Sequence, residues 1–248
     1  REARITTTVP DVPHDGGSAN RPLRVLIGGD TFGPDVNGAA KFAERLAAGL
    51  VERGHEVHIV APGAEGGPNV TRTEVHEDQP MTVHRLRSWR WYPHPWLRYA
   101  LPWRIEQNAA RILDTVKPDV VHFQSHIVVG RGLARQAVKR GIRVIGTNHF
   151  MPENGLQFTP FVGAFREPAV RAAWKAAGRT FGLAEAVTTP TRKAADYLEK
   201  YTDLDEVHPI SCGLHIDHYT PNLAPRTENV VLFLGRVEAE KHIEELLR

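Results

Sequence analysis

The chain has 248 residues, of which 41% are hydrophobic and 24% are charged, a composition that excludes wholesale disorder. Lysine and arginine number 31 against 29 acidic residues, a net charge of +2. This balance excludes a generic polyanion binder, and we expect no nucleic-acid partner. The one cysteine, Cys212, excludes an intrachain disulfide and indicates a reducing compartment such as the cytoplasm. No apolar run approaches the ~20 residues that a membrane-spanning helix needs.

Strand and helix patterns alternate from residue 23 onward. Residues 23–27 form a β-rich run that ends at Gly28, and apolar residues at helical spacing follow over 39–51. Asn37 is the expected N-cap of this helix, and Gly54 its expected stop. Further strands are predicted over 56–60, 81–84, 119–123, 142–147, 186–189 and 207–210, and further helices over 105–116, 133–139 and 192–201. The pattern predicts an α/β fold, a Rossmann-like open parallel sheet with helices on both faces.

The chain is expected to divide into four parts. Residues 1–21 are interpreted as a flexible extension and 22–218 as the Rossmann-like domain. Residues 219–229 hold Pro221 and Pro225 and are interpreted as a linker. A strand over 230–234 and a helix from residue 240 would then begin a second domain. One strand and two helical turns cannot bury a core, so this second domain is expected to be truncated.

The loop over residues 28–38 is the first candidate site. Ligands of open parallel sheets bind at the carboxyl ends of the strands, and a glycine-rich loop before a helix N-terminus favours phosphate. Asp30 and Asn37 lie in this loop, and His149 follows the strand over 142–147 at the same edge. The loop matches neither G-x-G-x-x-G nor G-x-x-x-x-G-K-[ST], which disfavours a dehydrogenase and a P-loop NTPase. A simple tight turn and a structural histidine remain the alternatives.

Histidine pairs at 55 and 58, 122 and 126, and 215 and 218 invite a metal hypothesis. None of them forms H-E-x-x-H, and a single cysteine offers no thiolate cluster. We therefore expect no metal and no other cofactor.

Five stretches, in order along the chain, resemble the retaining glycosyltransferases of family 4, which have the GT-B fold. They are residues 30–38 (DTFGPDVNG), 53–57 (RGHEV), 117–122 (KPDVVH), 209–217 (PISCGLHID) and 235–241 (GRVEAEK). This family includes phosphatidylinositol mannosyltransferases and sucrose-phosphate synthases. The resemblance runs from about residue 23 to residue 248, and it implies that the chain is the acceptor-side domain and the start of the donor-side domain.

The resemblance also implies roles for single residues. Arg236 and Lys241 match the cations that contact the donor diphosphate, where fixed positive charge would stabilise the leaving group. Gly38 matches a glycine beside the donor phosphates and sugar. His149 matches a histidine near the transferred sugar, although its neighbours match only in part. The family's paired glutamates belong beyond residue 248.

The implied reaction moves a hexose from a nucleotide sugar, of the GDP-mannose or UDP-glucose type, to an acceptor hydroxyl with retained configuration. No protein nucleophile or metal is needed, and the 248 residues alone are expected to be inactive. Transfer to a soluble acceptor is one alternative. A non-catalytic carbohydrate- or partner-binding module with the same fold is another.

An unusual stretch favours a lipid acceptor. No acidic residue lies between Asp78 and Glu106. The stretch interleaves arginines with aromatic side chains, among them Arg85, Arg87, Trp89, Arg90, Trp91 and Trp96. Such residues favour an anionic membrane surface, and three prolines predict a loop or broken helix. We therefore expect a cytoplasmic protein that is peripheral on the inner face of the membrane, with an aromatic lid over a soluble sugar as the alternative.

Overall fold

The computed structural model describes residues 21–90, 98–151 and 166–214, with 216, 219–221, 224–225, 228–235, 237 and 243–246. The strands are β1 (Arg24–Gly28), β2 (Glu56–Glu65), β3 (Val70–His76), β4 (Gln79–Arg90), β5 (Arg98–Ala100), β6 (Val120–Phe123), β7 (Arg143–Thr147), β8 (Ala186–Thr189) and β9 (His208–Pro209). The helices are α1 (Gly38–Glu52), α2 (Ile105–Val116), α3 (Val129–Val138), α5 (Arg166–Phe181), α6 (Arg192–Tyr201) and α7 (Ile243–Leu246).

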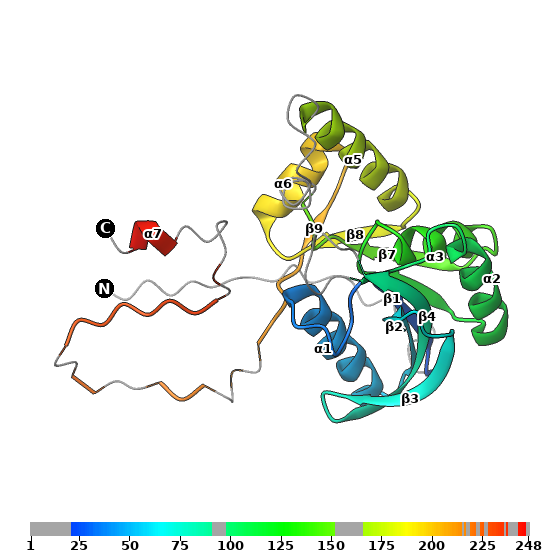
Figure 1. The fold of residues 1–248 in the computed structure, drawn as a ribbon, viewed down its shortest axis with the longest axis horizontal. Helices are drawn as coiled ribbons and strands as arrows, with labels where there is room; N and C mark the ends of the chain where they lie inside the picture. Colours follow the sequence, from blue (N-terminus) through cyan, green and yellow to red (C-terminus); the bar gives the residue numbers. More distant parts are fainter. Residues whose placement is uncertain are drawn as a thin grey trace. The chain divides into compact units, whose positions relative to one another are not determined.

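These strands form one mixed, mostly parallel sheet in the order β3-β4-β2-β1-β6-β7-β8-β9, with β5 paired to β4. β1 lies at its centre between β2 and β6, and both pairings are parallel. Figure 1 shows α1, α2, α3, α5 and α6 arranged around this sheet. The α/β, Rossmann-like fold class expected from the sequence is confirmed. The alternating pattern predicts this class because neighbouring parallel strands are usually joined by helical crossovers.

Two apolar clusters hold the sheet between its helices. Val25 and Ile27 of β1 pack with Ala43 and Ala47 of α1 on one face. Leu26 points the other way, into a larger cluster with residues of α2, α3, α5 and α6. This alternation is the period-two pattern of a strand that is covered on both faces.

Local signals place the helix ends where the sequence predicts them. The Asn37 side chain accepts a hydrogen bond from the Ala40 backbone N–H at 2.9 Å and caps α1. Gly54 follows the end of this helix with φ +83°, a conformation that glycine adopts without a steric penalty. α2 covers the predicted range and ends at Lys117. α3 begins four residues earlier than predicted, at Val129.

At one edge the sheet departs from the parallel arrangement of its other strands. β3 and β5 both pair with β4 in antiparallel orientation. The β3–β4 turn consists of Glu77 and Asp78, with φ values of 47° and 62°, as a two-residue hairpin requires. Within the stretch expected as a loop or broken helix, the described residues include the end of β4 and all of β5. Residues 91–97 lie outside the described part of the chain.

Two further expectations need correction. The sequence analysis did not predict α5, although its buried Trp174, Ala177 and Phe181 follow helical spacing. Residues 230–234 were expected as a strand, but they have no strand structure, and Val231 and Leu234 are 76% and 93% exposed. A strand needs a partner for its backbone groups and a face to bury, and the described residues provide neither for this segment.

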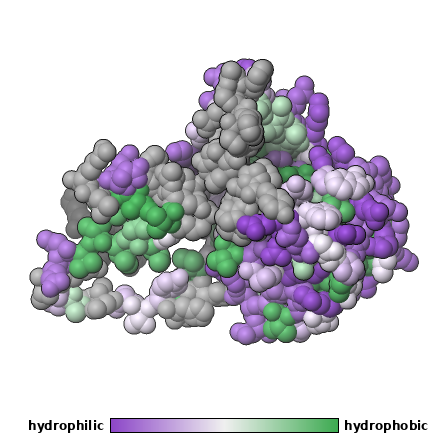
Figure 2. All heavy atoms as spheres, viewed as in Figure 1, coloured by the Kyte–Doolittle hydropathy of each residue, from purple (hydrophilic) through white to green (hydrophobic). Residues whose placement is uncertain are grey.

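The chain divides into two compact units, residues 1–212 and 213–248. The first unit contains the sheet and both apolar clusters. In the second, α7 is the one helix among the described residues, and apolar side chains are exposed along the unit (Figure 2). Across the described residues, every helix is too short or too polar to cross a membrane.

Candidate active site

The carboxyl ends of β1, β6 and β7 meet at one edge of the sheet. Gly28 of β1 is in register with Phe123 of β6, and Phe123 is in register with Gly146 of β7. The segments that follow these strands therefore lie side by side, and they contain Asp30, Gln124 and His149. This is the edge at which open α/β sheets bind their ligands.

Asp30 is buried and its carboxylate is fully engaged. One oxygen accepts the backbone N–H of Val129 at 2.9 Å, and the other accepts the N–H of Val128 at 3.2 Å and the hydroxyl of Ser125. These bonds satisfy backbone donors at the start of α3 and tie it to the β1 loop. The structure therefore gives Asp30, a predicted cleft residue, a positioning role.

Asn37 and Gly38 stand at the N-terminus of α1 on the same edge. Asn37 is half-buried and caps the helix, whereas Gly38 is exposed. A Cβ atom at Gly38 would meet no atom within 4 Å. Packing within the described protein therefore does not demand a glycine here, and the position leaves open space in front of free helical N–H groups.

His149 faces the same edge from the segment after β7. Its Nε2 is 2.9 Å from the Gln124 side-chain oxygen, and its ring lies 4.8 Å from that of Phe42 on α1. Burial lowers the pKa of His149 to about 4, so the ring is neutral at pH 7. With Nε2–H donating to Gln124, Nδ1 is the nitrogen with a free lone pair. Gln124 is a site residue that the sequence analysis missed, although it directly follows a predicted strand.

Buried donors without a protein partner gather at this edge. Within the described part of the chain, the Asn37 side-chain nitrogen, the Gln124 side-chain nitrogen and His126 Nδ1 are buried and make no hydrogen bond. Buried polar groups are nearly always satisfied. Two of these three atoms belong to residues already placed at the site, which indicates an edge built to contact a polar ligand.

Three other histidines, His122, His58 and His84, have structural partners. His122 donates to or accepts from the Thr147 hydroxyl at 2.7 Å, and that hydroxyl contacts Thr188 at the same distance. His58 and His84 stack with ring centroids 5.4 Å apart. Over the residues that the structure describes, no group of His, Cys, Asp or Glu side chains is arranged to hold a metal ion.

Arg85 does not belong to an exposed basic patch, contrary to expectation. It is buried, and its guanidinium donates to both oxygens of Glu74 and to the backbone carbonyls of Gly33 and Pro62. The reason is its place on β4 next to β3, the antiparallel neighbour whose Glu74 side chain it contacts. β3, which supplies Glu74, is the strand that the sequence analysis did not predict.

Arg87, Trp89 and Arg90 at the end of β4 are exposed. The Arg87 guanidinium lies 5.5 Å from the centroid of the Trp89 ring, which is 45% exposed. Trp103 is 76% exposed between β5 and α2. Trp91 and Trp96, the other predicted members of this patch, lie outside the described residues, as do Arg236 and Lys241 of the expected diphosphate site.

Comparison with known proteins agrees with this architecture. A sucrose-phosphate synthase from Thermosynechococcus elongatus matches the fold with a TM-score of 0.54 at 12% identity, over 82% of this chain and 51% of that one. The sequence profile of Glycosyltransferase Family 4 matches residues 36–218. The chain belongs to this family of GT-B-fold glycosyltransferases.

Its curated relatives include a GDP-mannose-dependent alpha-mannosyltransferase of Mycolicibacterium smegmatis, 28% identical over 240 residues. Another is a GDP-mannose-dependent alpha-(1-6)-phosphatidylinositol dimannoside mannosyltransferase of Mycobacterium tuberculosis, 24% identical over 237 residues. Both alignments cover 90% of this chain, which spans 59% and 56% of the two relatives' lengths.

Proposed function

We propose that the protein transfers a hexose, mannose from GDP-mannose in the first instance, to a hydroxyl of a membrane-lipid acceptor with retention of anomeric configuration. The observation that carries the proposal is the family match over residues 36–218, which include Gly38, Gln124 and His149 of the edge described above. The names of the relatives support GDP-mannose as the donor, and one of them includes a phosphatidylinositol mannoside acceptor.

The chemistry of the edge is compatible with this reaction. Open space at Gly38 in front of α1 suits the phosphates of a nucleotide sugar. A neutral His149, oriented by Gln124, can exchange hydrogen bonds with sugar hydroxyls without adding charge. We further propose that Arg236 and Lys241 stabilise the departing diphosphate and that the transfer needs no metal.

Gly38→Val provides the sharpest test of the donor position. The described packing accommodates a side chain there, so the variant should fold normally and lose transfer. The assay follows radiolabelled mannose or glucose from GDP-mannose or UDP-glucose into extracted membrane lipids or soluble sugars, using the complete gene product with and without EDTA. Arg236→Ala and Lys241→Ala should each slow transfer by roughly 10²-fold, whereas Arg143→Ala, a surface control, should not.

Several outcomes of this assay would contradict the proposal. Full activity in Gly38→Val would show that the donor does not bind at the N-terminus of α1. Wild-type rates in both charge variants would show that Arg236 and Lys241 do not stabilise the departing diphosphate. Loss of activity in EDTA would show a metal requirement. Absence of any transfer would favour a binding module, and the anomeric coupling constant of the product decides between retention and inversion.

We also propose that the exposed side chains Arg87, Trp89, Arg90 and Trp103 contact an anionic membrane surface. Arg87→Gln with Arg90→Gln, and Trp89→Ala with Trp103→Ala, should each weaken co-sedimentation with anionic vesicles. High salt should weaken it as well. Arg143→Gln and Tyr197→Ala serve as exposed controls on other elements. Equal binding to neutral and anionic vesicles would exclude this surface as an electrostatic membrane contact.

A further inference from the structure

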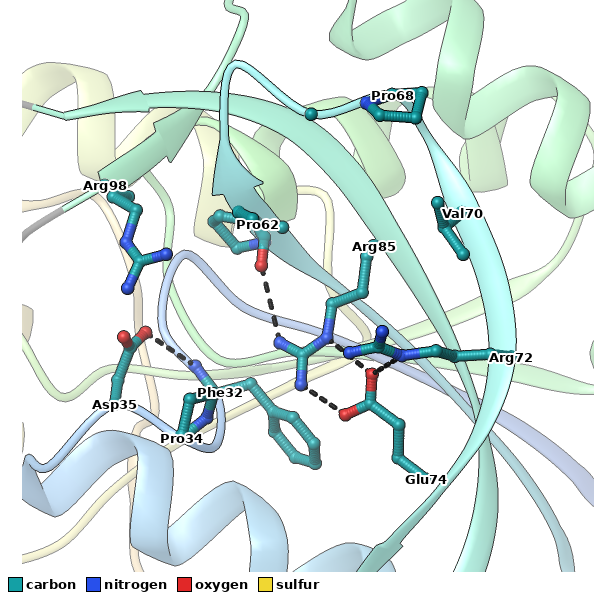
Figure 3. Close-up of a pocket in the computed structure, with 13 residues that line it drawn as sticks. Phe32, Pro34, Asp35, Pro62, Pro68, Val70, Arg72, Glu74, Arg85 and Arg98 are labelled. Carbon is teal, nitrogen blue, oxygen red and sulfur yellow. Dashed lines mark hydrogen bonds and ion pairs between the residues drawn. The ribbon is translucent and has the colours of Figure 1, made fainter.

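A pocket of about 270 Å³ lies beside the β1 loop, at the edge formed by β2, β3, β4 and β5 (Figure 3). Phe32, Pro34 and Asp35 of the loop contribute to its wall, together with Pro62 of β2 and Val70 of β3. Its charged lining consists of Asp35, Arg72, Glu74, Arg85 and Arg98. None of the roles derived for Gly38, Gln124 or His149 uses this pocket.

Within the wall, Glu74 is paired with both Arg85 and Arg72. Besides the two contacts from Arg85, Glu74 accepts from Arg72 Nε at 2.8 Å and lies 3.0 Å from His76 Nε2. Burial by itself would raise the pKa of Glu74, but these hydrogen bonds hold it at about 2. The Glu74 carboxylate is therefore ionised and saturated, and it has little capacity left for a ligand.

Asp35 and Arg98 have hydrogen-bonding capacity to spare. The Asp35 carboxylate accepts one long hydrogen bond, from the Phe32 backbone N–H at 3.4 Å. In Figure 3 the Arg98 guanidinium points toward Asp35, and no hydrogen bond joins it to another described residue. The two groups thus present free acceptors and free donors to the same space, and their charges cancel.

This pairing suits a neutral polyol better than an anion. A carboxylate can accept from two adjacent hydroxyl groups while a guanidinium donates to their oxygens. A phosphate bound at Arg98 would lie beside the Asp35 carboxylate, and the repulsion between the two anions opposes binding. The volume is just below the range of drug-sized ligand pockets and suits a single sugar-sized ring, with Pro34, Pro62 and Val70 as apolar walls.

We propose that this pocket binds a cyclic polyol, a pyranose or inositol ring of the acceptor, with a vicinal diol held between Asp35 and Arg98. The proposal rests on the transferase function proposed above and assigns the acceptor side of that site. It makes Asp35 and Arg98 specificity-determining residues, and it leaves Glu74 and Arg85 as the supporting wall.

The test is a direct titration of this chain, followed by NMR, with methyl α-D-mannopyranoside, myo-inositol and inorganic phosphate as separate probes. At least one polyol should shift the signals of residues 31–36. Asp35→Asn and Arg98→Gln should each weaken that binding at least 10-fold. Glu65→Gln and Arg143→Gln, exposed residues of β2 and β7, should leave it unchanged. Thermal melts establish that each variant is folded. If Asp35→Asn does not fold, Arg98→Gln still tests the proposal, because Arg98 is partly exposed.

The two polyol probes distinguish a pyranose from an inositol source. Phosphate binding that depends on Arg98, without polyol binding, would overturn the proposal, as would polyol binding that is unaffected by both variants. Lipid transfer by the complete gene product with an unchanged acceptor KM in Arg98→Gln would overturn the pocket assignment and leave the transferase function standing. Polyol binding without any transfer would contradict the transferase function instead.

Discussion

Single side chains at the carboxyl edge of the sheet differ in what they do for the protein. Asp30 accepts three hydrogen bonds from its own chain, whereas Gln124 accepts one and keeps an unpaired buried nitrogen. A saturated group holds structure, and a buried group with free capacity is available to a ligand. By this criterion Asp30 is a positioning residue, and Gln124 and His149 are candidates for ligand contact.

Asp30→Ala should lower the free energy of unfolding by about 1–3 kcal/mol, because it leaves two buried backbone donors at the start of α3 without an acceptor. Urea denaturation followed by circular dichroism measures the change. Asp114→Ala removes a carboxylate whose ion pair with Arg140 lies on the surface, and its stability should stay near that of the wild type. Equal stability of the two variants would show that the Asp30 bonds contribute little.

At the scale of helices and strands, local chemistry determines where elements begin. Asn37 and Thr191 both lie in extended backbone before a helix and accept from the N–H three residues on. Strands whose faces are exposed carry weaker signals. β3 is exposed at most of its positions, so it lacks the alternation of apolar and polar residues by which a strand is recognised. α5 carries a helical apolar pattern that includes Trp174 and Phe181, and this signal was present in the sequence.

Asn37→Ala and Thr191→Ala should each reduce the free energy of unfolding by about 1 kcal/mol, the usual value of a side-chain N-cap. Urea denaturation is again the measurement. Thr115→Ala, an exposed substitution inside α2, should remain within about 0.5 kcal/mol of the wild type. If loss of Thr191 leaves stability unchanged, the cap assigned to α6 is wrong.

At the scale of the whole molecule, buried histidines couple folding to pH. Burial is the largest cause that lowers the pKa values of His84, His122, His126 and His149 to about 4. The unfolded chain takes up protons at these residues near pH 6.5, whereas the folded protein does so near pH 4. Between these values the unfolded state binds more protons, so stability must fall as the pH is lowered.

We expect the free energy of unfolding to be nearly constant above pH 7 and to decrease from about pH 6.5 toward pH 4. The slope should approach about 1.4 kcal/mol per pH unit for each histidine that stays neutral. Urea denaturation at pH 8, 7, 6 and 5 measures it. His84→Gln should reduce this slope by the contribution of one histidine. The double variant His84→Gln with His126→Gln should reduce it by the contribution of two. Stability that rises on acidification would contradict the assignment of buried neutral histidines.

The sequence by itself determined the central strands and the bounds of α1, α2 and α6. It also determined the cap at Asn37 and the edge where His149 stands, because helical spacing, capping and strand order act over a few residues. Tertiary structure decided which side chains meet. Arg85 is buried because the β3 hairpin carries Glu74 to it, 11 residues away along the chain, and His149 meets Gln124 across a separation of 25 residues. The pocket between Asp35 and Arg98 exists because the β1 loop and four strands meet there. Sequence patterns over a few residues do not predict such long-range contacts.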